Sequence, residues 1–306
     1  MIYNLIIIGG GPAGITAGIY ASRQRMKTLL ITKELGGQIA EKAVDIENWP
    51  GNIKIAGPNL VNNFISHLKK QEVEIKYGEV RKIEKENNNF TIRTTENEKL
   101  FSSAVIIATG ADPRPLEVPG EKEFIGKGVS YCVTCDGPLF KNKDIAIIGG
   151  GNAGFEAAIF MTNYASKIYI LEYGSEIKAD AENQEEAKKS KNIEVIKNAI
   201  IKEIKGDKMV NGLVYENSVT KKIKNLKVQG VFVEIGSQPA TSLAKGLVDF
   251  NERDEIKVEF ETFQTKTPGL FAVGDVNTGK YKQIITAAGE GCKAALAAYE
   301  YVKKQK

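Results

Sequence analysis

Two of the three cysteines in this 306-residue chain, Cys132 and Cys135, stand two residues apart, and a carboxylate, Asp136, follows the second. A Cys-x-x-Cys pair can open and close a disulfide with little backbone movement. It does redox chemistry when one thiol has a lowered pKa and a proton donor is near, and Asp136 is placed to be that donor. The same spacing forms half of a zinc site, but the other candidate ligands, Cys292 and His67, are isolated in the sequence. Because a zinc site needs a second pair of ligands, these residues and their flanking sequence favour redox chemistry over metal binding.

The length and composition are typical of a globular protein with two domains. The 42 basic and 38 acidic residues give a net charge of +4, and lysines alternate with acids, so we expect a mixed solvated surface and no nucleic-acid partner. The apolar N-terminus is short and runs into three glycines, which indicates a buried strand and not a signal peptide. No apolar run is long enough to cross a membrane. Three cysteines fit a reducing compartment, and we expect a cytoplasmic protein.

A strand, a glycine turn and a helix open the chain. Residues 5–8 are a continuous apolar run, as in a parallel strand covered on both faces. Residues 9–14 follow with the Gly-x-Gly-x-x-Gly spacing. The first glycine permits the turn, the second lets the backbone approach a pyrophosphate, and the third lets helix and strand pack closely. The free N–H groups of the helix then face the phosphates, so this segment predicts a dinucleotide site.

The same pattern returns in residues 144–161, where a strand, a second glycine turn and a helix follow one another. Glu172 stands as far behind Gly149 as Thr32 stands behind Gly9, so the two segments share one register. The chain therefore contains two dinucleotide-binding folds.

The residues that would meet the two riboses differ. Thr32 leaves the ribose contact of the first fold uncertain, whereas Glu172 can accept both hydroxyls of an adenosine ribose and would repel a 2′-phosphate. Residues 115–252 contain no arginine that could clamp such a phosphate, and the nearest base is Lys178. The second fold therefore favours NADH over NADPH.

Short alternating strands in residues 73–103 and 193–235 predict a small β-meander in each fold. Three prolines in residues 113–119 and the run 236–239 indicate linkers. The predicted fold class is α/β, with two Rossmann-like three-layer domains, the second inserted in the first. The expected boundaries are 1–113 and 241–306 for the first domain and 114–240 for the second.

Other short motifs are more ambiguous. Gly36 and Gly37 form another turn that could let the backbone approach a ring system. Asp275 ends a strand and could hydrogen-bond a polyol chain or cap a turn. We interpret Trp49 as packed in a turn and Cys292 as a small core residue without a redox role.

In combination, these motifs resemble the low-molecular-weight thioredoxin reductases over essentially the whole chain. Residues 131–180 and 281–302 look most similar to the flavoprotein part of alkyl hydroperoxide reductase, which depends on NADH. The resemblance implies FAD in the first domain, NADH or NADPH in the second, and a homodimer. The motifs that carry it are residues 9–14, 36–38, 47–51, 108–110, 132–137, 149–154, 274–275 and 283–284.

The resemblance also assigns contacts residue by residue, and it implies no metal. Those for FAD are Gly9, Gly11, Pro12, Ala13, Gly14, Thr32, Gly36, Gly37, Gln38, Asn48, Thr109, Gly110, Gly274, Asp275, Lys282, Gln283 and Ile284. Those for NAD(P)H are Gly149, Gly151, Asn152, Ala153, Gly154 and Glu172.

By the same resemblance, Cys135 faces the flavin, Cys132 attacks the disulfide of a partner, and Asp136 supplies a proton. Rotation about the linkers would let the nicotinamide and the disulfide alternate beside the flavin. The NADPH-dependent members carry a His-Arg-Arg run where Glu172 and its neighbours stand here. The peroxide-reductase flavoprotein carries a further thioredoxin-like domain in front, so we expect the acceptor of this chain to be a separate thioredoxin-like or glutaredoxin-like protein.

Three alternatives remain open from the sequence. The chain could be an NADH oxidase or the reductase of a peroxiredoxin system. It could take electrons from a ferredoxin or a reduced flavin, although the intact second glycine turn and Glu172 argue against that. It could also be a non-catalytic flavoprotein whose dithiol state controls binding to a partner.

Overall fold

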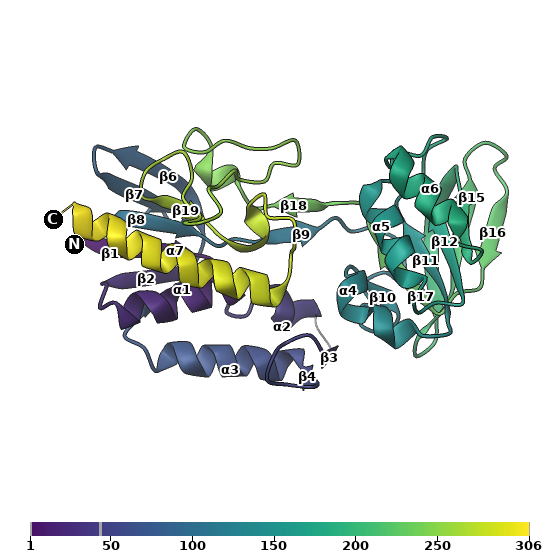
Figure 1. Ribbon diagram of the computed structural model, residues 1–306, viewed down its shortest axis with the longest axis horizontal. Helices are drawn as coiled ribbons and strands as arrows, with labels where there is room; N and C mark the ends of the chain where they lie inside the picture. Colours follow the sequence, from purple (N-terminus) through teal and green to yellow (C-terminus); the bar gives the residue numbers. More distant parts are fainter. Residues whose placement is uncertain (1, 43–44, 306) are drawn as a thin grey trace. The chain divides into compact units, whose positions relative to one another are not determined.

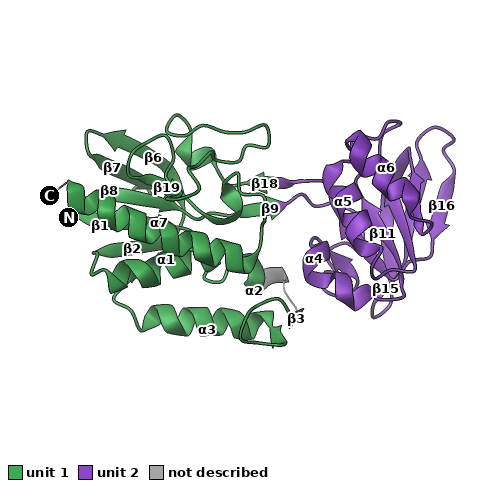
Figure 2. Cartoon of the chain, in the orientation of Figure 1, with its two compact units in different colours: residues 1–112, 238–306 green, residues 113–237 purple. Residues whose placement is uncertain are grey.

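The computed structural model describes residues 2–42 and 45–305 of the chain. It divides into two compact units, unit 1 with residues 1–112 and 238–306 and unit 2 with residues 113–237 (Figure 2). From the sequence, the chain is predicted to pass from the first domain to the second after residue 113 and to return after residue 240. In the structure the division falls inside two short strands, β9 (Ala111–Pro113) and β18 (Ser237–Pro239), which pair with each other. The connections between the units are thus two paired extended segments.

Unit 1 is built on a seven-stranded sheet in the order β5-β2-β1-β8-β7-β6, with β19 also paired to β8 (Figure 1). The strands β5, β2, β1, β8 and β19 are parallel, whereas β6 and β7 form the antiparallel meander. β8 is long because its residues 99–102 pair with β7 of the meander and its residues 101–107 pair with β1 of the parallel sheet. The strands are β1 (Ile2–Ile8), β2 (Thr28–Thr32), β5 (Glu74–Tyr77), β6 (Val80–Glu86), β7 (Asn89–Thr94), β8 (Lys99–Ile107) and β19 (Leu270–Ala272).

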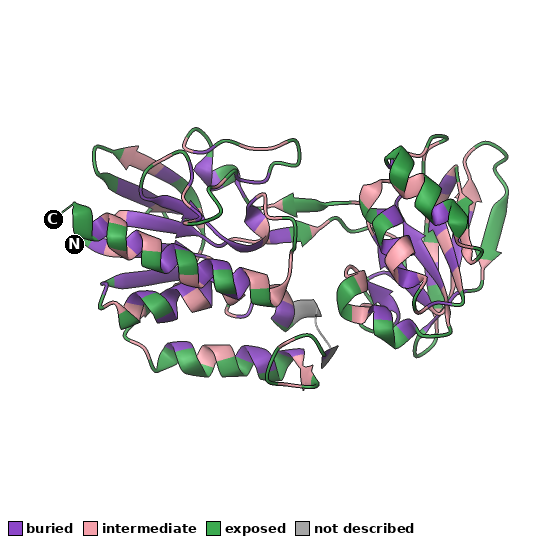
Figure 3. Ribbon diagram, viewed as in Figure 1, coloured by how far each residue is buried: buried purple, intermediate pink, exposed green. Residues whose placement is uncertain are grey.

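Helices α1 (Pro12–Arg23) and α7 (Ile284–Lys304) cover one face of the sheet, whose buried strands are purple in Figure 3. Helix α1 packs closely along α7, because Gly291 lets the backbone of α7 approach Ala13, where an added Cβ would lie 2.1 Å from the carbonyl oxygen. The remaining elements of unit 1 are α1 (Pro12–Arg23), α2 (Gln38–Lys42), β3 (Asp45–Ile46), β4 (Ile55–Ala56), α3 (Gly57–Lys69), η2 (Ser242–Ala244), η3 (Gly274–Val276) and α7 (Ile284–Lys304).

Unit 2 is built on a five-stranded parallel sheet in the order β10-β17-β11-β12-β13 and carries a three-stranded antiparallel sheet, β14-β15-β16. One face of the parallel sheet packs on α5 and the other on the antiparallel strands. The predicted α/β class with two Rossmann-like folds is confirmed. The elements of unit 2 are β10 (Val129–Ser130), α4 (Val133–Asp136), η1 (Gly137–Phe140), β11 (Asp144–Ile148), α5 (Asn152–Met161), β12 (Lys167–Leu171), α6 (Ala181–Lys189), β13 (Ile193–Ile196), β14 (Ala199–Gly206), β15 (Val210–Asn217), β16 (Ile223–Leu226) and β17 (Gly230–Val233).

Within the described residues, no helix is long and apolar enough to cross a membrane. In the same part of the chain, no cluster of His, Cys, Asp and Glu side chains has the arrangement of a metal site.

Candidate active site

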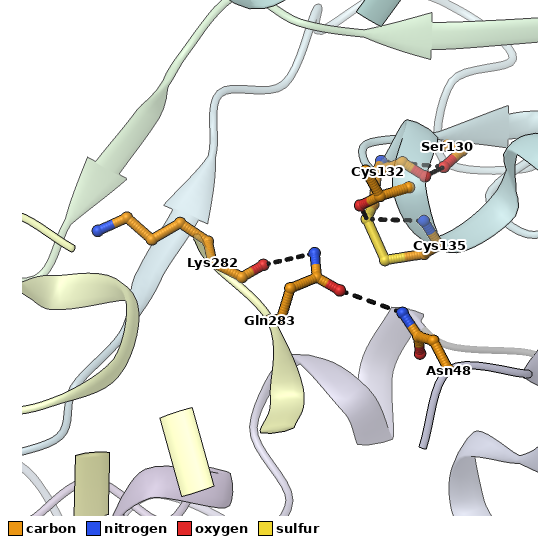
Figure 4. The surroundings of a disulfide bond; sticks show 7 residues. Asn48, Ser130, Cys132, Cys135, Lys282 and Gln283 are labelled. Carbon is orange, nitrogen blue, oxygen red and sulfur yellow. Dashed lines mark hydrogen bonds between the residues drawn. A yellow bond between two sulfur atoms is a disulfide. The ribbon is translucent and has the colours of Figure 1, made fainter. Parts of the chain in front are cut away.

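The cysteine pair forms a disulfide at the start of a one-turn helix in unit 2 (Figure 4). The Cα atoms of Cys132 and Cys135 are 5.3 Å apart. Cys132 caps helix α4 and is half-buried, whereas Cys135 is exposed. The disulfide is therefore reachable from solvent, as exchange with another dithiol requires.

Hydrogen bonds converge on Cys132. The N–H of Cys135 donates to Cys132 Sγ at 3.2 Å, and the hydroxyl of Thr134 lies 3.4 Å from the same sulfur. The N–H of Cys132 donates to Ser130 Oγ at 3.0 Å and fixes the start of the helix. These contacts would stabilise negative charge on Cys132 Sγ when the disulfide is open.

Asp136 is half-buried directly after the disulfide. Burial raises the pKa of its carboxyl, and a hydrogen bond with Ser130 opposes part of that shift. Asp136 therefore holds a proton to higher pH than an exposed aspartate does, which suits a proton donor to an opening disulfide.

A buried carboxylate supports the segment in front of the disulfide. Glu121 is 1% exposed, and it accepts hydrogen bonds from the N–H groups of Leu116 and Glu117 at 2.7 Å each. The hydroxyl of Tyr131 donates to the same carboxylate at 2.8 Å. Burial, and then Glu121, raise the pKa of Tyr131, so its hydroxyl stays a donor at neutral pH. This network fixes the residue that precedes Cys132.

Gly9, Gly11 and Gly14 of the first turn each favour glycine for a different physical reason. Gly9 has a φ of +114°, and an added Cβ would lie 2.2 Å from the carbonyl oxygen of Ala108. At Gly14 an added Cβ would lie 1.9 Å from the carbonyl oxygen of Gly9. Gly11 is different, because its φ is −76° and an added Cβ would meet no atom within 4 Å. The protein itself leaves room for a side chain at Gly11, so a glycine there fits a ligand held against the backbone.

The second turn repeats this geometry in unit 2. Gly149 has a φ of +122°, and an added Cβ would lie 2.4 Å from the carbonyl oxygen of Glu234. At Gly154 an added Cβ would lie 1.9 Å from the carbonyl oxygen of Gly149. At Gly151, with a φ of −86°, it would again meet nothing within 4 Å. Both turns therefore have the shape that receives a pyrophosphate at the start of a helix.

The two ribose positions differ in the structure as they do in the sequence. Thr32 is buried, and its hydroxyl donates to the carbonyl of Glu34 at 2.5 Å. Glu172 accepts from the N–H groups of Gly150 and Gly174 at 2.7 and 2.8 Å, one on each carboxylate oxygen. Each oxygen keeps a further lone pair, so Glu172 can still receive a pair of ribose hydroxyls.

The other nucleotide-site candidates in unit 2 lie at the start of α5. Asn152 is the first residue of the helix, and it exchanges two hydrogen bonds with Asp180, at 2.7 and 2.8 Å. Ala153 follows and is exposed. Asn152 thus anchors the loop before α6 beside the helix terminus.

Three distant segments meet at the carboxyl edge of the sheet in unit 1. An added Cβ at Gly37 would lie 3.2 Å from the Cα of Gly11, and one at Gly274 would lie 3.3 Å from the side chain of Ala13. The N–H of Gly36 donates to the first glycine turn at 2.8 Å. The structure therefore brings together these predicted flavin-site glycines around the start of α1.

Several predicted polar contacts bond to the protein itself. Gln38 donates to the carbonyl of Ala111, and the hydroxyl of Thr109 donates to the carbonyl of Ala240 at 2.8 Å. The amide of Asn48 donates to the side chain of Gln283 at 3.1 Å (Figure 4). Gly110, which lies between Thr109 and Ala111, has a φ of +71°. These bonds order the loops that border the same edge of the sheet.

The Gly274 turn is fixed by a carboxylate that the sequence did not single out. Glu290, on α7, accepts from the N–H of Gly274 and from the amide of Asn277, each at 2.7 Å. Burial raises the pKa of Glu290, against the opposing effect of these hydrogen bonds. Glu290 joins the last helix to the strand end that carries Asp275.

Lys282 acts on the same turn from the other side. Its ammonium lies 3.1 Å from Glu255 and donates to the carbonyl of Asp275 at 3.2 Å. Burial raises the pKa of Asp275, and the charge of Lys282 opposes this. Ile284, the next predicted contact, begins α7. Lys282 therefore holds the Asp275 backbone in place.

Trp49, His67 and Cys292 are not among the predicted site contacts. Trp49 packs edge-on against Phe64, with ring centroids 5.2 Å apart. His67 is exposed on α3, and Cys292 is half-buried, with its thiol in contact with the hydroxyl of Tyr20.

The comparisons with known proteins agree with this geometry. Residues 3–291 match the family model described as pyridine nucleotide-disulphide oxidoreductase. The chain is 40% identical to an NADH dehydrogenase of Bacillus subtilis and to an alkyl hydroperoxide reductase component of Pseudomonas putida, over 98% of its own length. It covers 58% of each of those two proteins.

Among the matching solved structures, two are thioredoxin reductases that align with nearly all of this chain. The thioredoxin reductase of Streptococcus pyogenes has a TM-score of 0.94 at 36% identity and is covered to 99% in both directions. That of Giardia duodenalis has a TM-score of 0.93 at 36% identity, over 98% of this chain and 99% of that one.

Two dinucleotide folds and a surface disulfide are the features expected of a pyridine nucleotide-disulphide oxidoreductase. The chain belongs to the pyridine nucleotide-disulphide oxidoreductase family.

Proposed function

We propose that this chain reduces the disulfide of a small thioredoxin-like or glutaredoxin-like protein with electrons from NADH. The observation that carries the proposal is the solvent-reachable disulfide in the unit that also contains the Gly149–Glu172 dinucleotide segment. The likeness to two thioredoxin reductases supports a thioredoxin-like acceptor. The likeness to the alkyl hydroperoxide reductase component and the carboxylate at Glu172 support NADH.

We assign FAD to residues 1–113 and 241–306 and the pyridine nucleotide to residues 114–240. The open backbone at Gly11 would receive the FAD pyrophosphate, and that at Gly151 would receive the pyrophosphate of the nucleotide. Glu172 would bind the adenosine ribose. The glycine and polar residues around the Gly37 and Gly274 turns would enclose the rest of the flavin nucleotide.

The residues of the disulfide have separate roles in this proposal. Bound FAD would supply the two-electron step between a nicotinamide and the Cys132–Cys135 bond. Opening that bond to a Cys132 thiolate and a Cys135 thiol requires two electrons and one proton, and Asp136 would provide the proton from its partly buried carboxyl. Cys132, with hydrogen-bond donors at its sulfur, would be the thiolate that attacks the partner. Cys135 would then complete the exchange and release the reduced partner.

The test is NADH oxidation by the FAD-loaded chain with and without a thioredoxin-like protein. Oxidation should depend on the partner and vanish in Cys135→Ser. Cys292→Ser is the matched control, because it removes the one cysteine outside the disulfide and should keep full turnover. Full partner-dependent turnover in Cys135→Ser would refute the disulfide relay.

A second candidate, the reductase of a peroxiredoxin system or an NADH oxidase, is favoured by the names of relatives that are 40% identical to this chain. Peroxide formed from oxygen without any protein partner, at a rate that Cys135→Ser does not change, would select the oxidase. Turnover with a peroxiredoxin but with no thioredoxin-like protein would select the peroxiredoxin-system reductase.

We also propose a cytoplasmic homodimer. The low cysteine count and the resemblance to the thioredoxin reductases support this proposal. Light scattering of the FAD-loaded chain tests the dimer, which predicts twice the chain mass of 33.5 kDa.

A further inference from the structure

A carboxyl that no motif contains lies at the second glycine turn. Glu234 directly follows β17, and its backbone carbonyl approaches Gly149 as the carbonyl of Ala108 approaches Gly9. The N–H groups of Glu234 and Ala108 also make equivalent bonds, at 2.8 and 2.7 Å, to the residue before each turn. Ala108 and Glu234 therefore occupy equivalent positions. Unit 1 has a methyl group at this position, whereas unit 2 has a carboxyl.

The position of Glu234 in the sheet is a place where ligands bind. From β11 the chain runs to β12 and β13 on one side, and it then returns to β17 on the other side of β11. The sheet order thus reverses between β11 and β17. In open parallel sheets, ligands occupy the crevice at the carboxyl ends of the strands where the order reverses. Glu172 directly follows β12 on one side of the turn, and Glu234 directly follows β17 on the other.

The side chain of Glu234 lies on the α5 side of the sheet. Phe232 packs in the cluster that contains Phe155 of α5, whereas Val233 belongs to the cluster on the opposite face. The bond from Glu234 to Ile148 continues the ladder, so alternation returns Glu234 to the face of Phe232. In unit 1 the equivalent methyl group also points at the turn, because it would lie 3.4 Å from a Cβ added at Gly14.

The carboxyl of Glu234 has a hydrogen-bonding capacity that the protein leaves unused. Within residues 2–42 and 45–305 it makes no hydrogen bond or ion pair. Burial raises the pKa of Glu234 to about 8, which favours the protonated carboxyl, with one donor and one acceptor, at neutral pH. A primary carboxamide offers the complementary acceptor and donor.

We infer that Glu234 is a positioning residue that binds the carboxamide of the nicotinamide, while Glu172 binds the ribose at the adenosine end. The inference rests on the proposed function, because it requires the pyridine nucleotide in unit 2. A dinucleotide whose pyrophosphate crosses the Gly151 backbone has its two halves on opposite sides of β11. The half beside β17 is then the nicotinamide half, and Glu234 is the polar side chain at that strand end.

The experiment compares ligands with and without the carboxamide, on the FAD-loaded chain and by calorimetry. The ligands are NAD⁺, its 3-acetylpyridine analogue and ADP-ribose. Glu234→Ala, which installs the residue found in unit 1, should weaken NAD⁺ about tenfold and leave ADP-ribose within about twofold. Glu234→Gln keeps a donor and an acceptor, and it should stay within about threefold of wild type for NAD⁺. The preference of wild type for NAD⁺ over the acetylpyridine analogue should disappear in Glu234→Ala.

Two results would overturn the inference while the proposed function stands. In one, Glu234→Ala binds NAD⁺ as wild type does. In the other, it weakens ADP-ribose as much as NAD⁺, which would give Glu234 a purely structural role at the turn. Glu172→Ala is the control, and it should weaken both NAD⁺ and ADP-ribose. If wild type binds none of the three ligands, the nucleotide assignment of unit 2 itself is refuted, and the inference falls with it.

Discussion

Replacing Gly151 by alanine tests whether this glycine is needed for nucleotide binding or for folding. An added Cβ at this position meets no protein atom within 4 Å, and φ is −86°, which any residue adopts. Gly151 is the N-cap of α5, where alanine is less favourable than glycine by about 0.5–1 kcal/mol. We therefore expect Gly151→Ala to fold, with only a small loss of stability.

The same methyl group should be costly to nucleotide binding. It would stand in the space that a pyrophosphate needs to reach the N–H groups of the turn. Loss of two charge-assisted hydrogen bonds at about 1.5 kcal/mol each gives about 3 kcal/mol, or roughly a hundredfold in affinity. Calorimetry with ADP-ribose measures the affinity, and urea unfolding measures the stability.

Gly154→Ala is the matched variant, because its Cβ would lie 1.9 Å from the carbonyl oxygen of Gly149. Such overpacking against backbone costs about 3 kcal/mol or more, so this variant should lose stability. The reasoning is refuted if Gly151→Ala binds ADP-ribose as tightly as wild type, or if it unfolds as easily as Gly154→Ala.

The remaining predictions concern three carboxylates. Glu172→Ala should bring the rates of flavin reduction by NADH and NADPH to within about threefold of each other, measured by anaerobic stopped flow; an unchanged ratio contradicts the ribose assignment. Glu121→Ala should lower the free energy of unfolding by about 3 kcal/mol in urea, since three part-buried donors lose their acceptor; a loss below about 1 kcal/mol contradicts this. Glu234 has a pKa raised from 4.5 to about 8, so its contribution to stability is complete below pH 4.5 and is lost as the pH rises through 8. The Tm of wild type relative to Glu234→Gln should therefore fall between pH 5 and pH 9, and a constant difference would show that the carboxyl is not buried in solution.

Much of the fold could be predicted because its determinants are local. The two glycine turns follow from φ values and backbone contacts that only glycine allows, and a buried apolar run precedes each one. The equal separations from Gly9 to Thr32 and from Gly149 to Glu172 also predicted that the two units share one register. By contrast, the sequence predicts only that short strands lie within residues 193–235, and the bounds of β14 (Ala199–Gly206) are set by its pairing with β15.

The parts of the site that escaped prediction depend on contacts between distant residues. Nothing in the sequence around Glu290 indicates that it receives the N–H of Gly274, since α7 must first pack beside the strand end. Glu121 likewise becomes an anchor only when the chain folds back to Tyr131. Ser130 stands two residues before Cys132, and its nearness to the motif was a signal that could have been used.

One measurement tests the electron path most directly. The FAD-loaded chain is given one equivalent of NADH without oxygen, thiols are alkylated, and the labelled peptides are identified by mass spectrometry. The account predicts new label on both Cys132 and Cys135 after NADH, and none on either before it. A flavin that bleaches with NADH while both residues stay unlabelled would contradict the account.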